Sequence, residues 1–230
     1  MAALTDPAAL GRLDLFRRLS TSDLGRINDQ LGTTKFPAGA MIFTADQPGE
    51  IAYIVLEGTL KVSVLQANGQ ELTLALLGPG ELVGEMAVAD RQRRSADVVA
   101  IEPALLLWVD RAAFDRLRRE LPQVTENLLA LMARRLRLTN AQLLALASLD
   151  VHGRVARQLL ALADAYGEQT PAGMRIPLRL TQSDLAGLVG ATRVRVNEVL
   201  VGFKRRGFVE VDGRYRVTVR DRAALADYIA

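Results

Sequence analysis

The densest group of chemically useful side chains lies between Leu82 and Val98, in the segment LVGEMAVADRQRRSADV. Gly84, Glu85 and Met86 follow a Gly-Pro-Gly turn, and we expect them to form a strand end that continues into a short helical turn. The free backbone N–H groups of such a turn attract an anion. Glu85 can accept a hydrogen bond from a hydroxyl group. The segment therefore predicts a site for a small anionic ligand.

Arg94, Ser95 and Ala96 open an alternating run of small and branched residues that predicts the next strand. A guanidinium at a strand start inside an apolar barrel is costly unless it is paired, and a phosphate fits its forked donors best. The alternative is that Arg94 and Glu85 pair with each other on a surface loop, which needs no ligand.

Composition limits the other chemistry that the 230 residues can carry. The chain has no cysteine and one histidine, His152, so disulfides, iron–sulfur ligation and thiol catalysis are excluded and almost no general base or zinc ligand remains. We therefore expect no enzyme and no metal. The chain has no long apolar run and no charged-then-apolar leader, so we expect a cytoplasmic protein that does not contact a membrane.

Charge is distributed unevenly along the chain. Residues 1–150 carry 16 Lys and Arg against 18 Asp and Glu, whereas residues 151–230 carry 13 against 8. The basic C-terminal third suggests a module that binds a polyanion, attached to a nearly neutral one.

Short strand patterns separated by turn signals at intervals of roughly ten residues fill the segment between Lys35 and Val109. Asn68-Gly69 is the strongest hairpin signal among them. The pattern predicts a β-roll or jelly-roll barrel. Ahead of it, Asp14 to Leu31 predicts short helices that cover one end.

A long helix follows the barrel pattern. Asp110 is a predicted N-cap, Pro122 suits a first helical turn, and no Gly or Pro follows until after Ala147. Seven positions have the 4-3 spacing of a coiled-coil seam: Thr125, Leu129, Met132, Leu136, Thr139, Leu143 and Leu146. A second apolar stripe contains Leu128, Leu131 and Leu138. We expect one face to pack on the barrel and the other on a second copy; the alternative is a helix that packs on its own barrel alone.

The basic C-terminal third contains the pattern of a helix-turn-helix. Thr181 to Asp184 form a capping box, Gly190 ends the first helix, and Thr192 caps a second. Four apolar residues of this second helix predict its buried stripe: Val196, Val199, Leu200 and Phe203. Projection at 100° per residue predicts an outward face of Val194, Asn197, Glu198 and Val201, flanked by Arg193 and Arg195.

Basic residues and two short strands follow the second helix. Lys204, Arg205 and Arg206 precede a pair of strand patterns that turn at Asp212-Gly213, which predicts a wing. Together with the local charge, the wing favours a winged DNA-binding domain over the alternative of a small helical bundle.

Three segments resemble the bacterial cyclic AMP receptor family, also called the CRP/FNR family, and the resemblance covers about residues 10–225. The residues Gly84 to Ala87 and Arg94 to Ala96 match the phosphate-binding cassette of cyclic-nucleotide-binding domains. The run MARRLRLTN from Met132, with Leu149-Asp150-Val151 and Gly153-Arg154, resembles the dimerisation helix and hinge.

The resemblance implies cyclic AMP as the ligand and gives each residue a role. Arg94 and Ser95 would hold the cyclic phosphate with backbone N–H groups near Glu85 and Ala96, and Glu85 would take the ribose 2′-hydroxyl. The implied cyclic AMP site contains Gly84, Glu85, Met86, Arg94, Ser95, Ala96, the walls Val62 and Leu74, and the base contacts Thr139 and Asn140. Asn140 stands where the best-known members have a serine.

The helix-turn-helix also resembles the family motif T-R-Q-E-I-G-X-X-V-G-X-S-R-E-T-V, with two departures. Arg193 matches the first base-reading Arg, but Val194 replaces the Glu and Glu198 replaces the second Arg. We expect Arg193 to contact a guanine, Glu198 a cytosine amino group and Val194 a thymine methyl. The candidate DNA contacts are Thr181, Gln182, Ser183, Thr192, Arg193, Val194, Arg195, Asn197, Glu198 and Lys204.

The sequence thus predicts an α+β protein with three parts: a cyclic-nucleotide-binding β-roll or jelly roll in residues 1–121, a coiled-coil dimerisation helix and hinge in 122–150, and a winged helix-turn-helix in 151–230. The expected function is a cyclic AMP-responsive transcription regulator that binds palindromic operators as a homodimer, with RNA polymerase as a partner. One alternative is a redox or gas sensor, for which the chain lacks cysteines and has no histidine in the barrel. Another is a regulatory subunit of an enzyme or channel, against which the wing argues.

Overall fold

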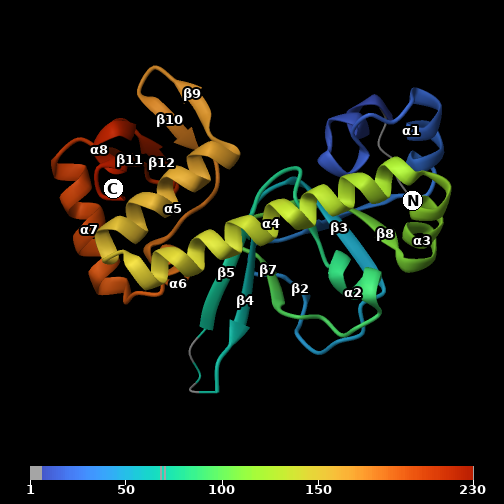
Figure 1. The fold of residues 1–230 in the computed structure, drawn as a ribbon, viewed down its shortest axis with the longest axis horizontal. Helices are drawn as coiled ribbons and strands as arrows, with labels where there is room; N and C mark the ends of the chain where they lie inside the picture. The colour runs from blue at the N-terminus through green and yellow to red at the C-terminus, as the bar shows by residue number, and fades with distance from the viewer. Residues whose placement is uncertain (1–6, 68, 70, 230) are drawn as a thin grey trace. The chain divides into compact units, whose positions relative to one another are not determined.

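A computed structural model describes residues 7–67, 69 and 71–229 (Figure 1). The described residues belong to two compact units. The first consists of Met1–Val64 and Leu76–Arg137, and the second of Leu65–Ala75 and Leu138–Ala230. Asn68, half of the predicted hairpin turn, lies outside the described residues, and Gly69 has the left-handed φ of 78° that such turns favour.

Two four-stranded sheets form the roll that the turn spacing predicts. Their strand orders are β1-β8-β3-β6 and β2-β7-β4-β5. The strands are β1 (Gly32–Phe36), β2 (Met41–Phe43), β3 (Ile51–Glu57), β4 (Leu60–Leu65), β5 (Glu71–Leu77), β6 (Leu82–Val83), β7 (Asp97–Ala100) and β8 (Ala104–Asp110). Pairing is antiparallel where β8 joins β1 and β3 and where β7 joins β2 and β4.

Short helices cover the roll, as the sequence predicts. They are η1 (Pro7–Arg12), η2 (Asp14–Phe16), α1 (Thr21–Asn28), α2 (Glu85–Asp90) and α3 (Arg111–Glu120). The side chain of Asp110 caps α3 by accepting from the N–H of Ala113 at 2.8 Å. Apolar side chains of these helices, including Phe16 and Phe114, form the core with β3 and β8.

The long helix α4 (Pro122–Ser148) begins at the predicted proline and has no interruption (Figure 1). Leu128 is buried and Leu131 and Met132 are partly buried against the core of the first unit. Leu138, expected in the same stripe, is 49% exposed, so this part of the expectation is wrong. The barrel-facing stripe therefore ends before Leu138, which belongs to the second unit.

The second unit contains a helix-turn-helix and a four-stranded sheet of order β11-β12-β10-β9. Its helices are α5 (Val151–Tyr166), α6 (Gln182–Val189), α7 (Arg193–Arg205) and α8 (Arg222–Ala226), and its strands are β9 (Glu168–Thr170), β10 (Gly173–Ile176), β11 (Val209–Val211) and β12 (Val217–Val219). The predicted roll, long helix and winged helix-turn-helix are therefore confirmed. Strands β9 and β10 were not predicted.

The described residues contain neither a membrane-spanning helix nor a cluster of metal-binding side chains. No helix among them is long and apolar enough to cross a lipid bilayer. Within the same ranges, no group of three or more His, Cys, Asp or Glu side chains is placed to hold a metal ion.

Candidate functional site

Gly84 joins strand β6 to helix α2, as the sequence predicts, and its backbone brings a guanidinium close. Its φ of 80° lies in the left-handed region that glycine adopts without strain. A Cβ atom at this position would lie 2.5 Å from Nη1 of Arg94. Only glycine therefore allows the Arg94 side chain to lie against this turn.

Arg94 is a buried cation that backbone carbonyls hold in place. Its side chain donates from Nη1 to the carbonyl of Gly84 at 2.8 Å and from Nη2 to that of Ile51 at 2.6 Å. The guanidinium carbon lies 4.1 Å from the centroid of the Phe43 ring. Within the described residues, Nε has no hydrogen-bond acceptor. Burial lowers the pKa of Arg94, because desolvation disfavours the charged form.

Glu85 is the second buried charge of this segment, at 2% exposed. Its Oε1 accepts from Nη1 of Arg135 at 2.6 Å, and its Oε2 has no donor among the described residues. Burial raises the pKa of Glu85, and the nearby Arg135 opposes that rise. The carboxylate therefore has one oxygen held by a cation and one buried oxygen without a donor among the described residues.

The alternative that Arg94 and Glu85 pair with each other on a surface loop is wrong. Arg94 is only 6% exposed, so neither side chain lies on the surface. Arg94 donates to carbonyl oxygens, and Glu85 accepts from a different arginine. Each residue therefore has partners of its own, and one atom of each, Nε of Arg94 and Oε2 of Glu85, has no partner in the described part of the chain.

Arg135 is a site residue that the sequence analysis missed. It lies on α4, donates from Nη2 to the carbonyl of Leu82 at 2.7 Å, and lies 3.6 Å from a carboxylate oxygen of Glu81. The adjacent Arg134 also contacts Glu81. The sequence did contain a signal for this contact, namely two consecutive arginines in a helix expected to pack on the barrel. Charged side chains are rarely buried unless they are paired, so these arginines predict acidic partners on the barrel.

The other predicted ligand residues lie in different surroundings. In the first unit, Ala96 is buried, Val62 is half-buried, and Met86 and Ser95 are exposed. In the second unit, Leu74 is 42% exposed, and Thr139 and Asn140 are exposed on α4. The roles of these residues toward a ligand stay predictions.

The helix-turn-helix has the caps that the sequence predicts. The Thr181 side chain accepts from the N–H of Asp184 and the Asp184 side chain accepts from the N–H of Thr181, which completes the capping box. Gly190 ends α6 in the left-handed conformation, and the Thr192 side chain caps α7. These caps fix where each helix begins, so the residues that face outward on α7 are also fixed.

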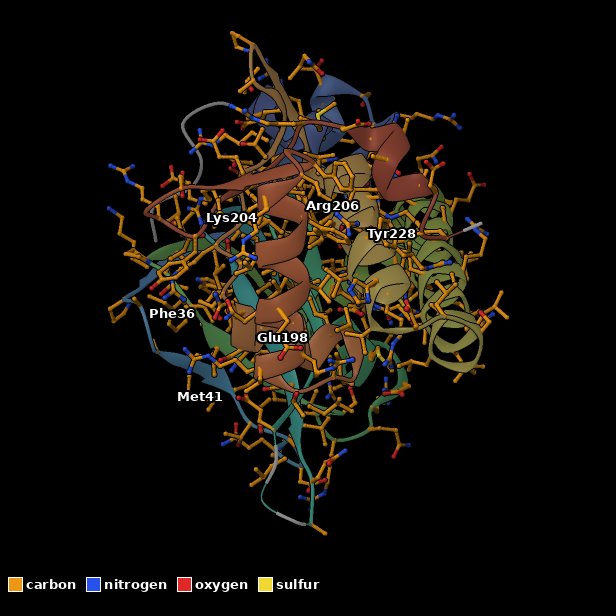
Figure 2. All side chains as sticks on the ribbon, turned by 90° about the vertical axis from the view of Figure 1, so that its left-hand side faces the viewer. Phe36, Met41, Glu198, Lys204, Arg206 and Tyr228 are labelled. Carbon is orange, nitrogen blue, oxygen red and sulfur yellow. The ribbon has the colours of Figure 1, made fainter. Side chains whose placement is uncertain are left out.

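The predicted faces of α7 are confirmed. Its buried stripe consists of Val196, Val199, Leu200 and Phe203. On the outward face, Val194 is 67% exposed, and Arg193, Asn197 and Glu198 are exposed. Figure 2 shows Glu198 and Lys204 on this helix, with Arg206 just beyond its end. The outward face therefore presents polar, charged and small apolar groups, as base readers require.

This surface contains one hydrogen bond and one ion pair between side chains. Nε2 of Gln182, on α6, donates to Oδ1 of Asn197 at 2.8 Å. Within α7, Nη1 of Arg195 lies 2.9 Å from Oε2 of Glu198. The position predicted to read a cytosine thus has an intrahelical ion pair in this structure.

The wing turns over more residues than the predicted Asp212-Gly213. Oδ1 of Asp212 accepts from the N–H groups of Arg214 and Arg216, each at 2.8 Å. Tyr215 has a φ of 60°, and the guanidinium of Arg179 lies 5.2 Å from its ring. The turn extends to Arg216 because the Asp212 side chain accepts hydrogen bonds from two backbone N–H groups, the second of which belongs to Arg216.

The predicted coiled-coil face of α4 is largely uncovered within the chain. Leu129 is 65%, Leu136 61% and Leu143 67% exposed. Single exposed leucines are ordinary, but a row at heptad spacing along one helix indicates a partner surface. That this surface is a dimer seam stays a prediction.

Comparison with known families and proteins agrees with these two sites. The cyclic nucleotide-binding domain family matches residues 33–120, and the Crp-like helix-turn-helix domain family matches residues 153–228. The first match contains the buried Arg94 and Glu85, and the second contains the helix-turn-helix.

Two relatives match this chain over nearly its whole length. The chain is 35% identical over 217 residues to a CRP-like cAMP-activated global transcriptional regulator of Mycobacterium tuberculosis, covering 94% of this chain and 96% of the relative. It is 36% identical over 213 residues to a cyclic AMP receptor protein of Thermus thermophilus, covering 93% and 95%. The structure of FixK2 from Bradyrhizobium japonicum superposes with a TM-score of 0.78 at 22% identity, covering 87% of this chain and 98% of that one, which supports the fold.

Proposed function

Because this chain belongs to the CRP/FNR family of transcription regulators, we propose that it binds cyclic AMP and, as a homodimer, recognises palindromic operators. The family consists of DNA-binding regulators and not of enzymes. The proposal concerns the ligand, the assembly and the form of the DNA site.

The observation that carries the ligand proposal is that each of the two buried charges has one atom without a hydrogen-bond partner among the described residues. Buried polar atoms almost always have a partner, so Nε of Arg94 and Oε2 of Glu85 favour a ligand with an acceptor for one and a donor for the other. A cyclic nucleotide supplies both, since its phosphate accepts and its ribose 2′-hydroxyl donates. Two relatives have cyclic AMP in their names, which favours adenine as the base.

The remaining cyclic AMP contacts follow by resemblance. Ser95 and Ala96 are proposed for the phosphate, and Val62 and Leu74 for the pocket walls. Thr139 and Asn140 are proposed to contact the base from the two subunits.

The assembly proposal rests on the exposed leucines of α4. Two copies that pair along Leu129, Leu136 and Leu143 would bury these side chains around a two-fold axis. In helix-turn-helix dimers the two recognition helices enter successive major grooves about 34 Å apart, so a two-fold dimer requires a palindromic site.

The ligand would act through α4. Arg135 on this helix holds one oxygen of Glu85, so a ligand that binds the other oxygen acts directly beside the helix that pairs the subunits. A ligand that favours one arrangement of the dimer shifts the population toward it. We further propose that RNA polymerase is the downstream partner and that the protein acts in the cytoplasm, with the DNA.

Titration calorimetry with cyclic AMP, cyclic GMP and cyclic di-GMP tests the ligand. Fluorescence anisotropy with randomised and then selected duplexes, with and without each nucleotide, tests the response. We expect cyclic AMP to bind most tightly and to increase operator affinity. Tighter binding of another nucleotide would show that cyclic AMP is not the ligand. Sequence-specific DNA binding that does not change with any nucleotide would refute the proposed regulation.

A further inference from the structure

The hydrogen bond between Gln182 and Asn197 joins the two helices of the helix-turn-helix on their outer surface. Gln182 is the first residue of α6, and Asn197 lies in the second turn of α7. Nε2 of Gln182 donates to Oδ1 of Asn197 at 2.8 Å. Asn197 is exposed, so this bond lies next to solvent and not in the core.

In this structure the bond orients the Asn197 amide. A side-chain amide has an oxygen that accepts and an NH₂ group that donates, and rotation by half a turn exchanges them. Because Gln182 donates to the oxygen, it favours the orientation in which Nδ2 points away from Gln182. The oxygen retains a second lone pair, and Nδ2 retains its donors.

An asparagine amide with this orientation is complementary to the edge of one base in the major groove, that of adenine. Adenine presents its N7 acceptor beside its N6 amino donor, and asparagine satisfies both at once through Nδ2 and Oδ1. Guanine presents two acceptors at the same edge and cytosine a single amino donor, so neither offers this pairing.

The position of Asn197 suits a base contact. It lies four residues after Arg193, so the two side chains are neighbours on the same exposed face of α7. The buried stripe on the opposite side fixes the rotation of the helix. The nearby Glu198 is engaged by Arg195, which leaves the Asn197 amide as the uncharged hydrogen-bonding group of this face.

We propose that Asn197 recognises an adenine in each operator half-site and that Gln182 is its positioning residue. Four residues of helix span about 6 Å, so this adenine lies within about two base pairs of the base that Arg193 contacts. The inference rests on the proposed DNA-binding function and adds a named base to it. Gln182 contributes by reducing the rotational freedom that Asn197 would lose on binding.

The experiment is a binding-site selection with the full-length protein, followed by affinity measurements on the selected duplex. In one duplex the adenine is replaced by 7-deazaadenine, which lacks the N7 acceptor and keeps the base pair. We expect wild type to lose roughly 5- to 100-fold in affinity on this change. For Asn197→Ala we expect a similar loss on the natural duplex and almost no further loss with 7-deazaadenine.

Variants of the second residue test its positioning role. Gln182→Ala should reduce the preference for adenine by less than Asn197→Ala does, and should have no further effect when combined with it. Gln182→Glu cannot donate, so it should also reduce the preference. Gln169→Ala, an exposed amide on β9, is the matched control and should leave the preference unchanged.

The outcomes separate this inference from the proposed function. A selected palindrome whose adenines are equally preferred by wild type and Asn197→Ala would overturn the inference and leave the proposed function intact. Equal loss of affinity for all sequences in both variants would also overturn it, because that result indicates phosphate contact or misfolding. Failure of wild type to select any sequence would overturn both.

Discussion

Nη1 of Arg135 donates to Oε1 of Glu85 at 2.6 Å, across 50 positions of sequence. The helix that presents the exposed leucines thus supplies the counter-ion of a carboxylate that is 2% exposed. Breaking such a pair leaves a buried charge without compensation, which costs more than the pair itself contributes. This contact therefore contributes to the stability of the first unit and keeps the buried charge of Glu85 compensated.

Arg135→Ala should lower the free energy of unfolding by about 1–3 kcal/mol near pH 7, toward the low end because the Arg135 side chain is 36% exposed. In a Glu85→Gln background the same change should cost clearly less, since a neutral amide needs no counter-ion. Urea denaturation of the four proteins of this double-mutant cycle gives the coupling energy. Equal costs in the two backgrounds would show that Arg135 acts only through packing.

Glu85 should also make stability depend on pH in a defined direction. Burial raises the pKa of Glu85 above its ordinary value of 4.5. Between the unfolded and folded pKa values the folded state binds more protons, so the free energy of unfolding should fall as pH rises through this range. Glu85→Gln lacks this titration, so urea denaturation at several pH values should show wild type losing stability relative to the variant. A difference that stays constant, or that grows in favour of wild type, would contradict the assignment.

Arg94→Leu should separate ligand binding from folding. The change removes the only proposed cationic partner of the phosphate and should cost roughly 3–5 kcal/mol of cyclic AMP affinity. Its effect on thermal stability should be smaller, because losing two bonds to carbonyl groups is offset by removing a buried charge. Calorimetry measures the affinity, and Arg93→Leu, at an exposed neighbour, is the matched control. Nearly unchanged cyclic AMP binding by Arg94→Leu would refute the proposed phosphate site.

Leu136→Glu should weaken self-association. Leu136 is 61% exposed at a heptad position, so two copies of the variant would bring like charges together at the proposed seam. Sedimentation at micromolar concentration should show a dimer for wild type and a shift toward monomer for the variant. Ala130→Glu, at an exposed position outside the seam, should remain dimeric. A monomeric wild type would contradict the proposed assembly.

The features that the sequence predicted best are formed by residues that lie close together in the sequence. The caps at Asp110, Thr181 and Thr192 each join a side chain to a backbone N–H within three residues, so spacing alone identifies them. The buried stripe of α7 follows from helical periodicity in the same way. The two charges singled out between Gly84 and Ala96, Glu85 and Arg94, are both buried, and they could be identified because they lie within one short segment.

Features that depend on distant or weak contacts were not predictable. The Arg135 contact joins two segments whose proximity is set by how α4 packs on the roll. Strands β9 and β10 are only three and four residues long. Strand β10 pairs with β9 on one side and with β12 on the other, and this pairing stabilises the two strands more than their own sequences do. Tyr215 adopts a left-handed backbone because Asp212 organises the turn around it, although aromatic residues rarely favour that conformation.

Arg193 and Lys204 should differ in how they bind DNA. Arg193 lies at the start of the outward face and is proposed to contact a guanine, so Arg193→Ala should lose about 1–3 kcal/mol of discrimination at one base pair. Lys204 lies in the last turn of α7 and is expected to contact phosphate. Lys204→Ala should weaken binding to all sequences alike and reduce the slope of log affinity against log salt by about one.

Val194 and Glu198 are expected to change the base preference of this protein relative to the DNA consensus of the family. Because they replace a Glu and an Arg, the selected palindrome should keep a guanine in each half-site but differ from the family consensus at a neighbouring position. Val194→Glu should move the selected site toward that consensus, since a carboxylate accepts from the cytosine amino group. Binding-site selection and salt titration of wild type, Arg193→Ala, Lys204→Ala and Val194→Glu measure these effects together. Selection of the unmodified family consensus by wild type, with no effect of Val194→Glu, would show that the outward side chains of α7 do not read bases as assigned.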